Sequence, residues 1–181
     1  KQRASEMALK GALFPWRTIS GNETSAYFPA GTAQYHINAD VAFAIQKYLN
    51  AIGGINQLPK DSLLTKSGIK EIAVETARMW LSLGSFIQEK GGAFCINEVT
   101  GPDEYSACVN NNSYTNLMAR ENLEFSVRIA EELKLTDKNE ITEEELALWK
   151  TAAEKMYIPF DKKTGIYSCI RFLILCSWFV K

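Results

Sequence analysis

The sequence predicts an all-α protein in which paired helices form part of a toroid, with long loops and at most a short strand or hairpin. Apolar residues recur at intervals of three and four over four segments of about 15–20 residues. The long connections between these segments carry the unusual residues, as expected when binding groups lie on loops over a helical scaffold. No pattern in the sequence indicates a parallel sheet.

The first two predicted helices cover residues 33–52 and 69–83. Gly53 and Gly54 follow the first helix and Gly84 follows the second, and glycine is the usual stop signal. Residues 1–10 are interpreted as the second half of a further helix. The apolar positions that define the two helices are Ile37, Val41, Ala44, Ile45, Tyr48 and Leu49, then Ile69, Ile72, Ala73, Trp80 and Leu83.

The next two helices lie in the second half of the chain. One is predicted over residues 115–135, and the other begins at the capping box Thr142–Glu145 and ends before Pro159. Between the second and third helices, apolar residues alternate around Phe94, which permits a short strand.

Composition limits the classes of function. The chain has 181 residues, 46% of them hydrophobic and 23% charged, and a formal net charge of −1. This charge gives no electrostatic reason to expect a nucleic acid or an anionic membrane as partner. With a single histidine, a histidine-based metal site is not expected. The four scattered cysteines form no Cys-x-x-Cys pair and suit a reducing, cytoplasmic location.

The last residues, 168–181, form an apolar tail that differs from the rest of the chain. The tail is shorter than the roughly 20 apolar residues of a membrane span, and Arg171 interrupts it. We interpret it as out-of-frame translation or a premature end, with a buried last strand or helix as the alternative.

The most informative stretch reads Thr-Gly-Pro-Asp-Glu-Tyr at positions 100–105. Gly and Pro hold the two carboxylic acids in a tight turn. Its neighbours Ile96 and Val99 are apolar, so we expect a partly desolvated carboxyl, which favours the protonated form and a proton-donor role. The alternative is an ordinary surface turn.

Two further stretches carry candidate binding residues. His36 and Asp40 lie one helical turn apart on a shared polar face that could bind the hydroxyl groups of a ligand; the alternative is a surface pair or a core histidine. Trp16 and Arg17 follow a proline in a loop, where an indole could stack on a pyranose and a guanidinium could hold hydroxyls or phosphate. Alternatively Trp16 is core and Arg17 pairs with a structural acid.

Together with an asparagine run at 110–112, these stretches closely resemble the disaccharide phosphorylases of glycoside hydrolase family 65, over roughly residues 4–167. The wording of residues 27–40 is similar to the kojibiose and trehalose phosphorylases more than to the maltose phosphorylases. The resemblance implies an (α/α)6, glucoamylase-like barrel, of which residues 1–167 would be a fragment. The asparagines could bind sugar or could cap and turn the chain.

The resemblance also implies a reaction, the inverting phosphorolysis of an α-glucosyl disaccharide to β-glucose 1-phosphate and glucose. Glu104 occupies the place of the family's general acid, with Asp103 as its competitor. Phosphate is the co-substrate, no metal or organic cofactor is implied, and the parent protein could be a homo-oligomer. The alternatives are an acid-trehalase-like hydrolase and a non-catalytic remnant, since the family's phosphate-binding residues and its upstream Trp-Asp pair are not found in the chain.

Overall fold

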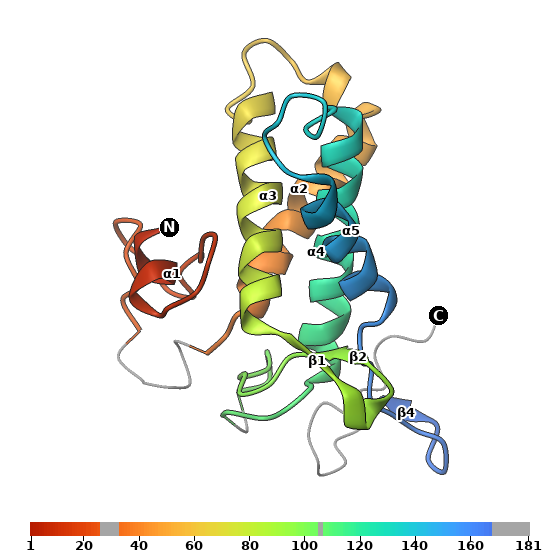
Figure 1. Ribbon diagram of the computed structural model, residues 1–181. Helices are drawn as coiled ribbons and strands as arrows, with labels where there is room; N and C mark the ends of the chain where they lie inside the picture. Colours follow the sequence, from red (N-terminus) through yellow and green to blue (C-terminus); the bar gives the residue numbers. More distant parts are fainter. Residues whose placement is uncertain (26–32, 105–106, 168–181) are drawn as a thin grey trace.

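A computed structural model describes residues 1–25, 33–104 and 107–167 (Figure 1). Within these residues, four long helices form the body of the molecule: α2 (His36–Ile52), α3 (Lys66–Leu83), α4 (Ser113–Glu132) and α5 (Glu143–Glu154). A short helix, α1 (Gln2–Glu6), and two single turns of 3-10 helix, η1 (Ile55–Gln57) and η2 (Gln88–Lys90), complete the helical elements. The predicted tail at 168–181 lies outside the described residues.

Helix α4 organises the core, since it packs against α2, α3 and α5. One apolar cluster joins α3, α4 and α5 around the fully buried Trp80, Leu123 and Trp149. A second cluster joins α2, α3 and α4 and includes Leu49 and Phe125. An amphipathic helix buries one apolar stripe, whose residues recur at intervals of three and four. Most of the apolar positions identified in the sequence lie on the helix faces that form these two clusters.

The helix ends follow the signals in the sequence. Helix α2 ends at Ile52 because Gly53 adopts a left-handed backbone, with φ of 89°. Helix α3 begins after Thr65, whose side chain accepts a hydrogen bond from the Gly68 N–H. Gly84 ends this helix where the Phe94 ring comes so close that a Cβ atom would lie 2.3 Å from Cζ.

The capping box predicted at the fourth helix forms only in part. The Thr142 hydroxyl accepts a hydrogen bond from the Glu145 N–H at 3.1 Å, as expected for an N-cap. The Glu145 carboxylate does not return to the cap but binds Arg78 of α3 instead. The start of α5 is therefore also a point of attachment to α3.

Two hairpins supply the only strands among the described residues. In the first, β1 (Ser85–Ile87) pairs antiparallel with β2 (Ala93–Cys95). Strand β2 is the short strand that the alternation around Phe94 permitted, and Phe94 is buried. In the second, β3 (Phe160–Asp161) pairs with β4 (Ile166–Tyr167). None of the helices described is long and apolar enough to cross a bilayer.

Candidate functional site

The Thr-Gly-Pro-Asp-Glu stretch lies on a loop whose base is closed by backbone hydrogen bonds. Val99 and Val109 exchange N–H···O bonds of 3.0 and 2.8 Å. The Thr100 N–H donates to the Ala33 carbonyl at 3.0 Å, which brings the loop beside the start of α2. The candidate acid and the candidate sugar-binding helix are therefore neighbours, although about 70 residues separate them in sequence.

The predicted turn is confirmed. The Glu104 N–H donates to the Gly101 carbonyl at 3.2 Å, with Pro102 and Asp103 between them. At Gly101 a Cβ atom would lie 2.5 Å from the Asn112 amide nitrogen, so any side chain at this position would displace the Asn112 amide. The turn is thus held against the N-cap of α4.

Backbone strain gathers in this loop. Four of the described non-glycine residues between positions 98 and 111 have a left-handed backbone, with φ of 55–58°: Glu98, Glu104, Cys108 and Asn111. Such conformations are uncommon for residues with a side chain and cluster at functional sites. Glu104, the candidate acid, is one of them.

The asparagine run has a structural role. The Asn111 backbone N–H donates to the Ile96 carbonyl at 2.7 Å, and the Ile96 N–H donates to the Asn111 side-chain Oδ1 at 3.3 Å. Asn110 accepts the Glu98 N–H at 3.1 Å, and Asn112 caps α4 by accepting the Thr115 N–H at 3.0 Å. Of the two interpretations of this run, capping and turning is the one that the contacts support.

Glu104 is exposed, so the partial desolvation expected from the sequence is not seen. Ile96 and Val99, the apolar residues expected to cover it, are fully buried and point into the core instead. One carboxylate oxygen, Oε1, accepts a hydrogen bond of 2.7 Å from Nε2 of Gln34. Gln34 is buried, so the exposed Glu104 carboxylate is hydrogen-bonded to a side chain in the protein interior.

His36 and Asp40 share one face of α2, as their spacing predicts, and they bind each other. His36 Nδ1 lies 2.8 Å from Asp40 Oδ2, and His36 Nε2 lies 3.1 Å from Gln34 Oε1. The other Asp40 oxygen accepts the Tyr114 hydroxyl at 2.9 Å. Burial, together with the Asp40 carboxylate, raises the pKa of Tyr114 to about 12, so this hydroxyl keeps its proton.

These contacts form one chain of hydrogen bonds, Glu104–Gln34–His36–Asp40–Tyr114. Both ring nitrogens of His36 are engaged within it, whereas Asp40 stays half-buried and accessible from solvent. Gln34 and Tyr114 were not identified as site residues from the sequence. The signal that could have found Gln34 is its position two residues before His36, within the same dense stretch.

Trp16 and Arg17 lie on a separate loop. The Arg17 guanidinium stacks over the Trp16 ring, 3.9 Å from its centroid, with Arg17 exposed and Trp16 half-buried. The acid of this loop, Glu23, pairs with Arg3 rather than with Arg17. The described contacts do not bring Trp16 or Arg17 to Glu104, so their binding role stays a prediction.

Glu23 fixes the shape of this loop. Its carboxylate accepts the backbone N–H groups of Trp16 at 2.8 Å and Arg17 at 3.1 Å, as well as the side chains of Arg3 and Ser25. Burial raises the pKa of Glu23, but these hydrogen bonds outweigh it and lower the value to about 2.

The loop is also tied to α2, at Asn38. The side chain of Asn38 accepts the Phe14 N–H at 2.8 Å and donates to the Ala12 carbonyl at 2.7 Å. Asn38 lies between His36 and Asp40 along α2, so the Trp16 loop approaches the same end of that helix.

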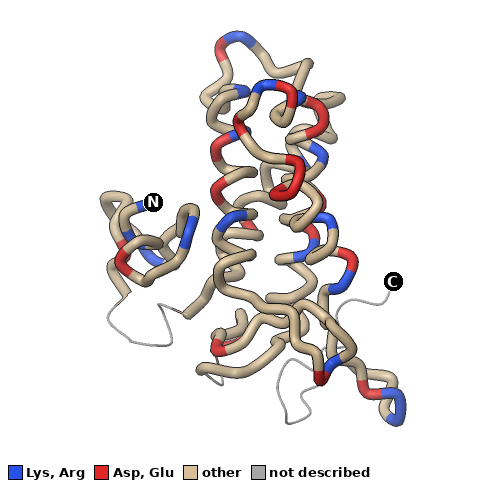
Figure 2. Tube along the Cα trace, viewed as in Figure 1, with Lys and Arg blue, Asp and Glu red and all other residues tan. Residues whose placement is uncertain are grey.

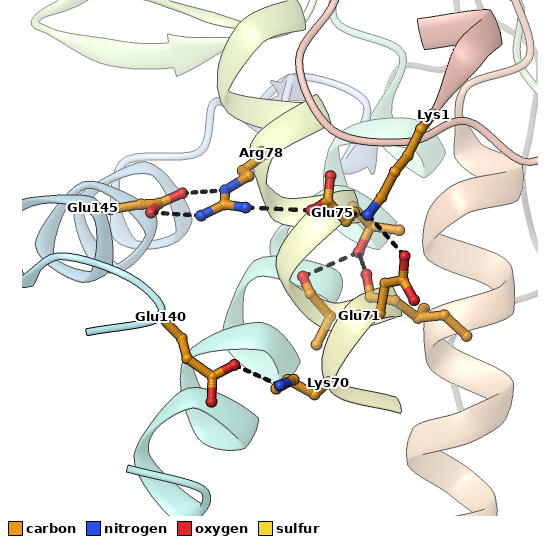
Figure 3. Close-up of polar contacts among 10 residues, drawn as sticks. Lys1, Lys70, Glu71, Glu75, Arg78, Glu140 and Glu145 are labelled. Carbon is orange, nitrogen blue, oxygen red and sulfur yellow. Dashed lines mark hydrogen bonds and ion pairs between the residues drawn. The ribbon is translucent and has the colours of Figure 1, made fainter. Parts of the chain in front are cut away.

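Charged side chains of both signs are interspersed along the helices (Figure 2). Two residues of α3 form ion pairs to neighbouring segments (Figure 3): Arg78 bonds to Glu145 at 2.6 and 3.1 Å, and Lys70 pairs with Glu140. Arg78 also bonds to Glu75, on α3 itself, at 3.2 Å. A cavity of about 370 Å³ lies beside this face, lined by the 12–14 segment and α3. Neither the ion pairs nor the cavity involves Glu104, His36 or Trp16. Within the part of the chain described, no group of His, Cys, Asp or Glu side chains could hold a metal ion.

Comparison with known proteins gives one consistent family. A profile described as the glycosyl hydrolase family 65 central catalytic domain matches residues 1–174. The α,α-trehalose phosphorylase of Thermoanaerobacter brockii is 49% identical over 175 residues, covering 92% of this chain and 22% of that enzyme. The kojibiose phosphorylase of Caldanaerobacter subterraneus subsp. tengcongensis is 35% identical over 185 residues, covering 90% and 23%.

A solved structure, a putative kojibiose phosphorylase from human microbiome, superposes with a TM-score of 0.76 at 31% identity, over 94% of this chain and 23% of that one. The predicted fold class, a helical fragment of a toroid with only short hairpins, is thereby confirmed. The chain spans about a fifth of the length of these relatives.

Proposed function

Because the chain belongs to glycosyl hydrolase family 65, we propose that residues 1–167 form part of a catalytic domain that phosphorolyses an α-linked glucose disaccharide of the trehalose or kojibiose type. The products are β-glucose 1-phosphate and glucose. The names of the relatives, trehalose and kojibiose phosphorylases, support the substrate class. The cytoplasmic location, the homo-oligomeric parent and the interpretation of residues 168–181 stay predictions.

Glu104 serves as the general acid in this proposal. It gives its proton to the glycosidic oxygen as the bond from that oxygen to C1 breaks, and a phosphate oxygen forms a new bond to C1 from the opposite face. One carboxyl group is enough for this reaction, whereas an inverting hydrolase needs a second carboxylate roughly 6.5–9.5 Å away to activate water. Asp103, the competitor, lies beside it on the same exposed turn.

The observation that carries the proposal is the way Glu104 is presented. It is exposed at the tip of a turn, its backbone is left-handed, and a buried amide holds its carboxylate. A surface turn with no role would have no reason to keep an acidic side chain in this combination of strain and anchoring.

Sugar binding is assigned to Trp16, Arg17, His36 and Asp40. The Trp16 indole offers an apolar face to a pyranose ring, and the exposed Arg17 guanidinium offers donors to hydroxyls or phosphate. Asp40 has the accessible oxygens of the α2 pair, so it would accept hydroxyl hydrogens while His36 orients it.

The test uses an exchange enzyme, which we define as the T. brockii trehalose phosphorylase with its matching segment replaced by residues 1–167. In this enzyme Glu104→Gln should lower kcat for trehalose plus phosphate by about 10²-fold or more, the range of general acid catalysis. The same variant should lose much less activity on α-glucosyl fluoride plus phosphate, because fluoride leaves without a proton.

Equal losses on both substrates would move the acid role away from Glu104, and Asp103→Asn would then be the next variant. Glucose release that does not depend on phosphate would support the hydrolase alternative instead. The 181-residue chain by itself serves as the negative control, since a general acid without a positioned nucleophile supplies only part of the rate enhancement.

A further inference from the structure

Gln34 lies directly beneath the candidate acid. Its Nε2 donates to Glu104 Oε1 at 2.7 Å, and the residue is only 5% exposed. The hydrogen bond crosses from the segment before α2 to the 100–104 turn. A second bond joins the same two segments, from the Thr100 N–H to the Ala33 carbonyl at 3.0 Å.

The other end of the Gln34 amide is also fixed. Its Oε1 lies 3.1 Å from His36 Nε2, so the amide nitrogen is turned toward Glu104 while its oxygen faces the ring. The His36 ring is in turn held by Asp40 at 2.8 Å and packs edge-on against Tyr114, with ring centroids 5.5 Å apart. His36 is only 4% exposed, so these hydrogen bonds are shielded from water.

An exposed glutamate on a turn samples several rotamers, and only some of them point at a given oxygen of a bound sugar. A hydrogen bond from a buried amide that is itself held at its other end restricts this freedom before substrate binds. Misplacing a reacting group by about 1 Å can cost on the order of 10²-fold in rate, so such restriction matters for the chemical step.

We propose that Gln34 is a positioning residue for the general acid: it sets the direction of the Glu104 carboxyl, and the His36–Asp40–Tyr114 hydrogen bonds set the direction of the Gln34 amide. This inference rests on the proposed role of Glu104. After proton transfer, the same Gln34 N–H donates to the carboxylate that remains. Glu104 therefore keeps one position before and after it gives up its proton.

Gln34→Met in the exchange enzyme tests this role. Methionine is similar in length but forms neither hydrogen bond, so the site stays filled while the link is lost. Gln46→Met is the matched control, because Gln46 is a half-buried glutamine on α2 about 15 Å further along the helix axis than His36. For each variant, kcat and KM are measured with trehalose and with α-glucosyl fluoride, both with phosphate, together with Tm.

We expect Gln34→Met to lower kcat for trehalose by about 10- to 100-fold, a part of the general acid contribution. Activity on the fluoride should fall by less than about threefold, and Gln46→Met should change neither. A Gln34→Met enzyme with equal losses on both substrates, or with no loss on trehalose, would overturn the inference.

Two further variants keep the result interpretable. Tyr114→Phe removes only the hydroxyl at the far end of the chain and should give a smaller loss, about threefold, again selective for trehalose. If Gln34→Met does not fold, an unselective Tyr114→Phe would overturn the inference. Glu104→Gln separates the two proposals. If this variant loses equal activity on trehalose and on α-glucosyl fluoride, Glu104 is not the general acid. If Glu104→Gln is selective for trehalose but Gln34→Met is not, only the positioning role of Gln34 is refuted.

Discussion

Replacing Glu23 by Gln should loosen the loop that presents Trp16 and Arg17. The Glu23 carboxylate accepts the N–H groups of both residues and the side chains of Arg3 and Ser25. Glutamine keeps the size but carries no charge, and it offers an N–H₂ group where only acceptors fit. One of the two backbone N–H groups, at position 16 or 17, would then face the amide N–H₂ group instead of an acceptor oxygen.

The pKa of Glu23 sets the size of the effect. It is about 2 against an ordinary 4.5, because the hydrogen bonds outweigh the opposite effect of burial. Each pKa unit is worth about 1.4 kcal/mol, or about 3 kcal/mol in all for a fully buried group. The Glu23 side chain is 13% exposed and that of Arg3 is 21% exposed, so solvent screening reduces the expected loss to about 1–2 kcal/mol.

The pH dependence follows from the direction of the shift. A carboxyl whose pKa is lower in the folded state stabilises that state fully above its unfolded value and loses this contribution as the pH falls toward the folded value. The advantage of wild type over Glu23→Gln should therefore be constant above pH about 5 and decline as the pH falls from about 4.5 through about 2.

Hydrogen exchange of the 14–25 segment in the exchange enzyme measures this directly. A loss of 1–2 kcal/mol corresponds to about 5- to 30-fold less protection of the position 16 and 17 amides at neutral pH. Glu89→Gln, at an exposed position on η2, is the control and should change nothing. Unchanged protection in Glu23→Gln, or a difference that is undiminished at pH 2, would refute the reasoning.

Three stability predictions concern the scaffold, each measured by urea unfolding of the exchange enzyme. Gly11→Ala should cost more than about 2 kcal/mol, because its Cβ would lie 2.0 Å from the Glu75 carbonyl oxygen at a φ of 76°; Gly165→Ala, with φ of 70° and open space around it, should cost about 1 kcal/mol. Asn122→Ala should cost about 1–3 kcal/mol, because it leaves the buried Trp80 indole N–H without its acceptor at 2.9 Å. Thr142→Ala should cost about 1 kcal/mol through loss of the α5 cap.

The helices could be predicted from the sequence because their signals are local. The spacing of apolar residues predicted α2 and α3. Gly53 marked the end of α2, because glycine readily adopts the left-handed backbone found there. Strand β1 was missed because three residues are too few to show alternation, and β3 and β4 are shorter still. Helix α1 covers only Gln2–Glu6 of the helix expected over residues 1–10.

The candidate site could be predicted only where its geometry is local. The 101–104 turn follows from Gly and Pro, and the shared face of His36 and Asp40 follows from helical spacing. The link from Gln34 to Glu104 depends on how two segments about 70 residues apart are docked by the Ala33–Thr100 backbone bond. No periodicity in one sequence contains that information.

The exposure of Glu104 shows how a buried base and an exposed tip are combined in one loop. Val99 pairs with Val109 as in an antiparallel ladder. Beyond this pair, Asn111 bonds to Ile96 through its backbone N–H and its side-chain oxygen. These contacts bury the apolar residues that the sequence placed near the acid, and so leave the acid in solvent. The left-handed backbone at Glu98, Cys108 and Asn111 lets the chain reverse around this short base. The strained residues are therefore distributed along the loop, and within the described residues the Gln34 amide holds the Glu104 carboxylate from outside the loop.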